Sequence, residues 1–263
     1  MMAAEPYDER MHGQPVPDGD VVAAFDFDGT LTRGGSVWQF LTTVRGRSRV
    51  VAAGFVVAPK LALALLVGGR WVDAAKEALF VWTLKGLPAD DVARQAAAFG
   101  TAHFHHRSRT AVLARLDWHR RQGHHVVIVS ASPEYYVGPV ARAFGAQAVV
   151  ATRLAIDDRG RLTGRFDGGN CRGAHKVSRL TAWMKASLPP NDASPNNSDG
   201  QSHLARQASG GTPRGRPFLW AYGNSAGDRE LLEAADIGVD AGRLGRFGKL
   251  RRFRRLGEVL TAW

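Results

Sequence analysis

Two carboxylates, Asp26 and Asp28, stand two residues apart where an apolar run of the chain ends. The run covers residues 21–24, and its Val and Ala residues predict a buried parallel strand. Alternate residues of a strand share a face, so both carboxylates are expected to point the same way at the strand end. Gly29 permits a sharp turn there, and Thr30 offers a hydroxyl and an N–H group to an anion.

This pair of acids indicates a metal site. Neighbouring carboxylates repel each other, and they are costly at a strand end unless a cation lies between them. Mg²⁺ is the natural candidate, because it is a hard cation that prefers oxygen ligands. A calcium loop begins in a similar way, but its twelfth position must be Glu and is Val37 here. A turn with two solvated acids is the simpler alternative, and the buried run before the acids argues against it.

Three later segments place polar groups beside apolar or helical stretches. The apolar run 126–129 leads into Ser130-Ala131-Ser132, and the run 218–222 leads into Gly223-Asn224-Ser225-Ala226-Gly227-Asp228. Gly173-Ala174-His175-Lys176 opens a stretch with the spacing of an amphipathic helix. Each of these segments is a weak signal alone.

Together and in this order, the four segments resemble the four motifs of the haloacid-dehalogenase superfamily of hydrolases. The resemblance is to subfamily IB, the phosphoserine-phosphatase-like branch. It implies an α/β fold, with a doubly wound, Rossmann-like parallel sheet as the catalytic core. It also implies an all-helical cap of the C1 type, inserted after the first strand.

The resemblance assigns a role to each acid. It implies that Asp26 is a nucleophile that forms an aspartyl-phosphate, and that Asp28 is first a general acid and then a general base. It also implies that Mg²⁺ is held by the Asp26 carboxylate, the Asp28 backbone carbonyl and the Asp228 carboxylate. Asn224 occupies the place of the first acid of the fourth motif, so this metal site carries one negative charge fewer and weaker metal affinity is expected.

The same resemblance implies a set of groups that bind the phosphoryl oxygens. These are Thr30, Ser130, Ala131 and Lys176. Lys176 would act as a point charge. An ordinary exposed lysine in the first turn of a helix is the alternative for that residue.

Spacing predicts the domain organisation. Roughly a hundred residues separate the first two motifs, too many for a simple crossover between neighbouring strands. We therefore expect a core formed by residues 19–34 and 106–263, with a helical cap at 35–105. Residues 1–18 are polar and predict a flexible tail without a secretory signal. Residues 187–216 lack periodicity and predict a disordered insertion.

Apolar patterning predicts cap helices at 37–41, 50–67, 71–84 and 88–105. The run 51–67 is the most apolar part of the chain, but Pro59 and Lys60 fall at its centre. A charge at that place costs about 3 kcal/mol on membrane-insertion scales, which disfavours a membrane span. Two interpretations of this run remain, namely the wall of a hydrophobic pocket and a surface that contacts lipid.

The net charge of +11 and the isoelectric point near 10.6 favour anionic partners. Basic and apolar residues alternate over 243–255, which fits either a final helix packed on the core or contact with an anionic membrane. Nucleic acid is not the expected partner, because no nucleic-acid-binding motif accompanies the charge. The single cysteine, Cys171, excludes an intramolecular disulfide, so a cytoplasmic location is expected, with membrane association as an extension of it.

These observations predict a phosphatase, namely a Mg²⁺-dependent phosphomonoester hydrolase that acts on a small phosphorylated metabolite. Phosphoserine itself is not favoured, because Gly35 stands where phosphoserine-specific relatives carry an acid for the substrate ammonium group. A phosphatase of lipid phosphates at the membrane surface is the alternative within enzymes. A weakly catalytic basic protein that binds anionic polymers is the alternative of another class. The sequence does not indicate an oligomeric state.

Overall fold

The computed structural model describes residues 20–188, 216–242, 253–256 and 259. The predicted flexible tail at 1–18 lies outside the described residues. So does nearly all of the predicted disordered insertion at 187–216.

The described core is a seven-stranded sheet in the order β4-β3-β2-β1-β5-β6-β7. Its strands are β1 (Val21–Phe25), β2 (His125–Pro133), β3 (Ala148–Ile156), β4 (Leu162–Asp167), β5 (Phe218–Gly223), β6 (Ile237–Asp240) and β7 (Arg254–Arg255). Neighbouring strands are parallel except β3 and β4, which are antiparallel. The predicted α/β fold with a parallel sheet is confirmed.

Strand β1 lies at the centre of the sheet, between β2 and β5, and is buried along its whole length. Its alternate side chains enter two different apolar clusters. Ala23 and Phe25 belong to the cluster on one face, and Val22 and Ala24 to the cluster on the other. Burial on both faces explains why the strand is an unbroken apolar run, and it fixes where the chain emerges at Asp26.

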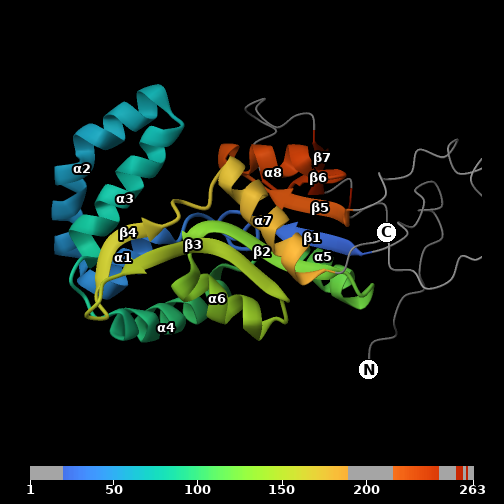
Figure 1. Cartoon of the computed structure of the whole chain (residues 1–263), viewed down its shortest axis with the longest axis horizontal. Coiled ribbons are helices and arrows are strands. Elements are labelled where there is room, and N and C mark those ends of the chain that lie inside the picture. The colour runs from blue at the N-terminus through green and yellow to red at the C-terminus, as the bar shows by residue number, and fades with distance from the viewer. Residues whose placement is uncertain (1–19, 189–215, 243–252, 257–258, 260–263) are drawn as a thin grey trace, which may run out of the picture.

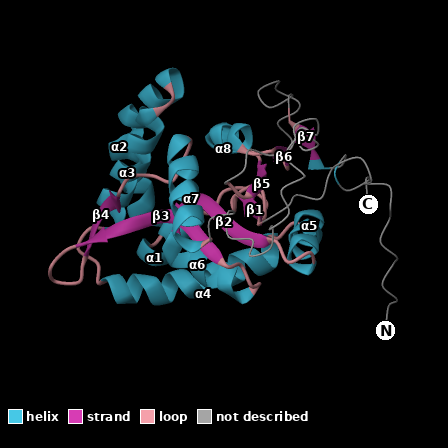
Figure 2. Cartoon of the chain, turned by 45° about the vertical axis from the view of Figure 1, so that its right-hand side comes forward, coloured by secondary structure: helices cyan, strands magenta, loops and turns pink. Residues whose placement is uncertain are grey.

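Helices cover both faces of the sheet (Figure 2). Those of the core are α5 (Thr110–Arg121), α6 (Glu134–Ala143), α7 (Ala174–Ser187) and α8 (Arg229–Ala234), and a short 3₁₀ helix spans Ala226–Asp228. Leu116 of α5 and Val137 of α6 pack into one apolar cluster, whereas Leu180 of α7 and Leu231 of α8 pack into the other. This is the two-sided covering that a doubly wound sheet requires.

The segment between β1 and β2 is helical in its described part. Its elements are α1 (Val37–Arg45), α2 (Arg47–Val67), α3 (Arg70–Leu84), α4 (Ala89–Arg107) and then α5 of the core. Helix α4 continues past the cap boundary predicted at residue 105, because Ser108 N–H still donates to the Phe104 carbonyl in the helical pattern. It packs along α6, so it joins the cap to the core.

Helices α2 and α3 form a hairpin that projects beyond the sheet (Figure 1). Helix α2 passes through Pro59 without ending. Within the described residues, no helix combines the length and the apolar character that crossing a membrane demands.

One expectation about the basic segment is wrong over its described part. Arg254 and Arg255 form β7, which pairs with β6 in parallel, and are not part of a final helix. The edge of β6 offers unpaired backbone groups, and pairing with an extended segment satisfies them. Residues 243–252 lie outside the described structure.

The contact between α4 and α6 predicts that replacing a glycine of α4 by alanine destabilises the protein. A Cβ atom at Gly100 of α4 would lie 2.6 Å from the Tyr136 carbonyl oxygen of α6. Gly100→Ala should therefore lower the free energy of unfolding by about 1–3 kcal/mol through overpacking. Gly54→Ala in α2 is the matched control, because the nearest atom there is 3.7 Å away. Gly54→Ala should raise the free energy of unfolding by up to about 1 kcal/mol, because alanine has a higher helix propensity than glycine. Urea unfolding measures both, and equal effects would contradict the packing described.

Candidate active site

The predicted site residues converge at the edge of the sheet where β1, β2 and β5 end. They are Asp26, Asp28, Thr30, Ser130, Ala131, Lys176, Asn224 and Asp228. The loop after β1 is fixed to β5, because Asp26 N–H donates to the Tyr222 carbonyl at 2.9 Å. Parallel strands place their carboxyl ends at the same edge, so segments far apart in the sequence meet there.

Lys176 lies at the centre of the site, in the first turn of α7, and its side chain is only 1 % exposed. Its Nζ donates to Asp26 Oδ1 at 2.6 Å, to Asp228 Oδ1 at 2.6 Å and to the Val129 carbonyl at 2.7 Å. Burial alone would lower the pKa of Lys176, but the two carboxylates raise it above its ordinary value. The alternative of an exposed surface lysine is therefore wrong.

The two carboxylates that flank Lys176 differ in their surroundings. Burial and the nearby Asp228 charge raise the pKa of Asp26 above its ordinary value, against the opposing effect of Lys176. Burial also acts to raise the pKa of Asp228, but Lys176 and several hydrogen bonds outweigh it and lower that pKa overall. Asp228 Oδ2 accepts from the Ser225 hydroxyl at 2.7 Å and from the backbone N–H groups of Ser225 and Asn224. Asp228 is thus a fixed anion.

The Asn224 carboxamide lies among oxygen atoms of the loop after β1. Thr30 Oγ1 donates to its oxygen at 3.1 Å. With the amide turned over, its nitrogen instead donates to Asp26 Oδ2 at 3.2 Å and to the Asp28 carbonyl at 2.9 Å. Either an N–H donor or a cation is needed to hold these oxygens together, because oxygen acceptors repel one another.

Asp28 is held by hydroxyl groups on one of its oxygens. Asp28 Oδ2 accepts from Ser36 Oγ at 2.7 Å and from Ser132 Oγ, and Ser36 is hydrogen-bonded to the Tyr136 hydroxyl at 2.7 Å. Asp28 Oδ1 is buried and has no hydrogen-bond partner among the described residues. The side chain is therefore oriented through one oxygen, and the other is left without a hydrogen-bond partner among the described residues.

Ser130 and Lys76 are two further polar residues of the candidate site. Ser130 Oγ accepts from the Ser132 N–H at 3.0 Å, so its own proton stays available to a further acceptor. Lys76 reaches in from α3 of the cap and donates to the Ala131 carbonyl at 2.6 Å and to Asn170 Oδ1 at 2.9 Å. Burial lowers the pKa of Lys76 to about 8.

The sequence did not reveal Lys76, Asn170, Ser36 and Tyr136 as members of the site. None of them stands in a motif, and three-dimensional packing alone brings them to Asp28 and Ala131. A lone lysine in a helix reads as a surface charge. Only its position between Ala75 and Phe80, both buried, could have suggested that it faces inward.

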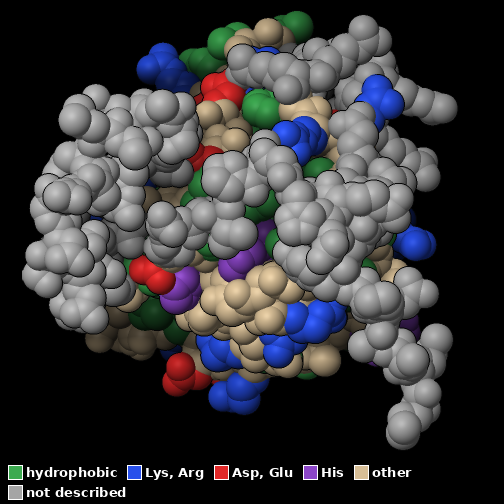
Figure 3. All heavy atoms as spheres, turned by 90° about the vertical axis from the view of Figure 1, so that its right-hand side faces the viewer, with side chains coloured by type: hydrophobic (Ala, Val, Ile, Leu, Met, Phe, Trp, Pro, Cys, Tyr) green, Lys and Arg blue, Asp and Glu red, His purple; other side chains and the backbone are tan. Residues whose placement is uncertain are grey.

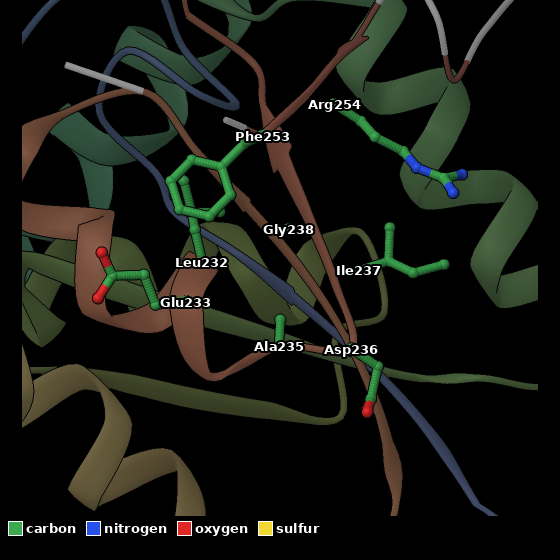
Figure 4. A pocket seen from close by; sticks show the side chains of 8 residues that line it. All are labelled: Leu232, Glu233, Ala235, Asp236, Ile237, Gly238, Phe253 and Arg254. Atoms are coloured by element: carbon green, nitrogen blue, oxygen red, sulfur yellow. The ribbon is translucent and has the colours of Figure 1, made fainter. Parts of the chain in front are cut away.

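A separate cavity of about 560 Å³ is lined by residues of α8, β6 and β7 and of the segments beside them (Figure 4). Its lining includes Leu232, Ile237 and Phe253 and none of the predicted site residues. We assign the chemistry to the edge of the sheet that holds Asp26, where the charged groups converge.

Comparisons with known proteins identify a family and relatives for the chain. The model of the haloacid dehalogenase-like hydrolases matches residues 23–233. Protein CicA of Caulobacter vibrioides is 32 % identical over 236 residues, which cover 90 % of this chain and 90 % of that protein.

Two solved structures share the fold. A protein of unknown function from Bordetella pertussis has a TM-score of 0.67 at 22 % identity, covering 90 % of this chain and 98 % of its own. A phosphoserine phosphatase, solved as an analogue of its phospho-aspartyl intermediate, has a TM-score of 0.54 at 17 % identity. The match covers 92 % of this chain and 98 % of that one.

The position of Lys176 predicts a large effect on stability. In Lys176→Met, two buried carboxylates lose their cation, so the free energy of unfolding should fall by about 3–5 kcal/mol. Lys185→Met on the exposed side of the same helix is the control and should change it by less than about 0.5 kcal/mol. Both are measured by urea unfolding with a chelator present, so that no divalent cation replaces the ammonium group.

The loss in Lys176→Met should also depend on pH. Without the ammonium group, both acids have pKa values raised above the value of about 3.9 in the unfolded chain, so the folded state binds more protons. The free energy of unfolding of the variant should then fall more steeply than that of the wild type as pH rises above about 4. If the difference in free energy of unfolding between the wild type and the variant were independent of pH, Lys176 would not be the cation that pairs with Asp26 and Asp228.

Proposed function

Because the chain belongs to the haloacid dehalogenase-like hydrolase family, we propose that it is a Mg²⁺-dependent phosphatase of small phosphorylated metabolites. The reaction proceeds through an aspartyl-phosphate on Asp26. The observation that carries the proposal is the buried arrangement of Asp26, Lys176 and Asp228, joined by contacts of 2.6 Å.

In the first step, an Asp26 oxygen attacks phosphorus and the bond from phosphorus to the leaving oxygen breaks. Asp28 donates its proton to that leaving oxygen. In the second step, Asp28 accepts a proton from water as the water attacks phosphorus, and the Asp26 carboxylate is released with inorganic phosphate. Uncatalysed hydrolysis of phosphate monoesters is very slow, so the site must lower the barrier by on the order of 20 kcal/mol.

The surroundings of Asp28 support its role in proton transfer. Ser36 and Ser132 hold Oδ2 in one orientation, and Oδ1 is the oxygen without a partner. A general acid needs such a fixed carboxyl with one oxygen free to face the leaving group. Ser36 lies just before α1, so the position of α1 and the orientation of Asp28 are connected through this hydroxyl.

The oxygens around Asn224 fit a hard divalent cation. Asp26 Oδ2, the Asp28 carbonyl and the amide oxygen of Asn224 are the groups we propose as Mg²⁺ ligands. Asp228 was expected to contribute a ligand as well. Its oxygens accept from Lys176, Ser225 and Asn224, so we propose that it acts by fixing Lys176 and the Asn224 backbone. When bound, Mg²⁺ neutralises charge on the phosphoryl oxygens.

The phosphoryl group itself meets donors from several elements. Lys176 supplies the charge, Ser130 a hydroxyl proton, and the backbone N–H groups near Thr30 and Ala131 further donors. Lys76 adds a second cation beside Ala131, from the cap. A substrate with another anionic group beyond the phosphate would suit that cation.

A second candidate substrate is a lipid phosphate, and the apolar outer face of α2 favours it. The basic binder of anionic polymers remains the alternative of another class. Hydrolysis of p-nitrophenyl phosphate with and without Mg²⁺ separates the enzymes from the binder. We also infer a cytoplasmic location from the single cysteine, Cys171, a buried free thiol.

Substitution of Asp26 or Asp28 should impair the reaction, whereas substitution of Asp20 should not. Asp26→Asn should abolish hydrolysis of p-nitrophenyl phosphate, because an amide does not attack phosphorus. Asp28→Asn should lower kcat by about 10²–10⁴-fold, since it removes general acid–base catalysis. Asp20→Asn, near the other end of β1, is the control and should retain wild-type kinetics. Wild-type rates from Asp26→Asn or Asp28→Asn would remove this mechanism.

Asn224→Asp tests the metal ligands without relying on turnover. In a chelator, the new carboxylate lacks the amide N–H group and faces Asp26 Oδ2 and the Asp28 carbonyl oxygen, so the free energy of unfolding should fall by about 1–3 kcal/mol. With Mg²⁺, the added charge should tighten binding, so Tm should rise by more than in the wild type. A smaller rise in Tm on adding Mg²⁺ than in the wild type would exclude Asn224 as a ligand.

A further inference from the structure

Helix α2 is apolar on all sides, which is unusual for a helix on a protein surface. Its inner face packs against the rest of the protein, because Val50, Ala53 and Val57 are buried. Its outer face is not covered in the described structure. Phe55 is 77 % exposed and Leu66 is 85 % exposed, and the spacing of eleven residues puts both on one side of the helix.

This outer face continues onto α1. The Trp38 ring lies beside Gly54, where an added Cβ atom would be 3.7 Å from it, and the Trp38 side chain is 47 % exposed. We call the exposed side chains of Trp38, Val51, Phe55, Val56, Leu63 and Leu66 the hairpin face. All of them except Trp38 lie on α2, which projects with α3 from the body of the molecule (Figure 1).

The charged residues of α1 and α2 are all of one sign. No Asp or Glu occurs between Asp28 and Asp73, whereas Lys and Arg occur six times in that interval. Four of these cations are exposed in or beside α2, namely Arg47, Arg49, Lys60 and Arg70. The opposite end of the molecule differs, because acidic and basic side chains are interspersed there on the described surface (Figure 3).

We propose that the hairpin face docks on an anionic lipid bilayer. Exposed apolar side chains beside the exposed cations of α2 are complementary to such a surface, with the apolar groups entering it and the cations meeting the headgroups. Trp38 at the margin is a residue type that favours the membrane interface. A second copy of this chain fits less well, because its own Arg47, Arg49 and Lys60 would face like charges.

The helix lies on the bilayer and does not cross it. Lys60 and Pro59 fall in the middle of α2, and the exposed face is backed by the buried side chains that hold α2 to its neighbours. Helix α3 pairs with α2 and also carries Lys76, which reaches the Ala131 carbonyl. Docking therefore restrains the hairpin whose Lys76 borders the site.

Co-sedimentation of the full chain with vesicles tests the proposal. The wild type should bind vesicles of phosphatidylcholine with phosphatidylglycerol, and should bind those of phosphatidylcholine alone more weakly. The doubly substituted Phe55→Asp, Leu66→Asp variant should lose at least about tenfold in affinity. Ile156→Asp is the matched control, because Ile156 is 51 % exposed on β3, outside the hairpin face, and should bind as the wild type does.

A second pair of variants tests the charges. Arg47→Gln with Arg49→Gln should weaken binding to anionic vesicles and leave binding to neutral ones unchanged, and high salt should act in the same direction. Asp26→Asn should bind as the wild type does, so failure of the proposed catalysis and failure of docking are distinguishable. Urea unfolding establishes that each variant is folded.

Two results would overturn the docking proposal. The first is vesicle binding by Phe55→Asp, Leu66→Asp equal to that of the wild type. The second is absence of wild-type binding to anionic vesicles. A dimer in light scattering that this variant abolishes would then assign the hairpin face to a second copy of the chain.

Discussion

One buried lysine between two buried carboxylates organises the functional edge of this protein. Lys176 comes from α7, Asp26 from the end of β1 and Asp228 from the loop after β5, so their contacts of 2.6 Å tie three separate segments together. Buried charges are tolerated only when they are paired and hydrogen-bonded. The three segments must therefore bring their charged side chains to the same place. The third donor contact of Lys176, to the Val129 carbonyl, adds β2 to the same point.

The sheet supplies the rigidity that this charge cluster needs. Because β1 is buried on both faces and paired on both sides, Asp26 has little freedom, and the chain can turn away only at Gly29. A Cβ atom at Gly29, whose φ is 82°, would overlap the Asn224 amide at 2.2 Å. The close approach of these two loops is what gathers the proposed metal ligands. Cap residues then reach this fixed edge: Ser36 holds Asp28, and Lys76 contacts Ala131.

The strand ends and the family could be predicted from the sequence because their signals are local. An apolar run followed by Asp26, by Ser130 or by Gly223 and Asn224 marks a strand and its polar end within a few residues. The roles of Tyr136 and Lys76 could not, since their partners Ser36 and Ala131 lie 100 and 55 residues away in the sequence. Ser36 lies only eight residues from Asp28, but it stands in no motif that marks it as a partner. Likewise, the apolar run of α2 favoured a pocket wall over a lipid contact. Only its exposure in the folded chain favours the second.

The central claim is that Asp26 carries the phosphoryl group between the two steps of hydrolysis. Mass spectrometry after rapid acid quenching tests this most directly, with the Asp28→Asn variant incubated with substrate and Mg²⁺. Loss of Asp28 slows attack by water, so the account predicts a phosphoryl group on the peptide that contains Asp26. Turnover by the wild type with no phosphoryl group on that peptide in the variant or the wild type, or with the group on another residue, would contradict the account.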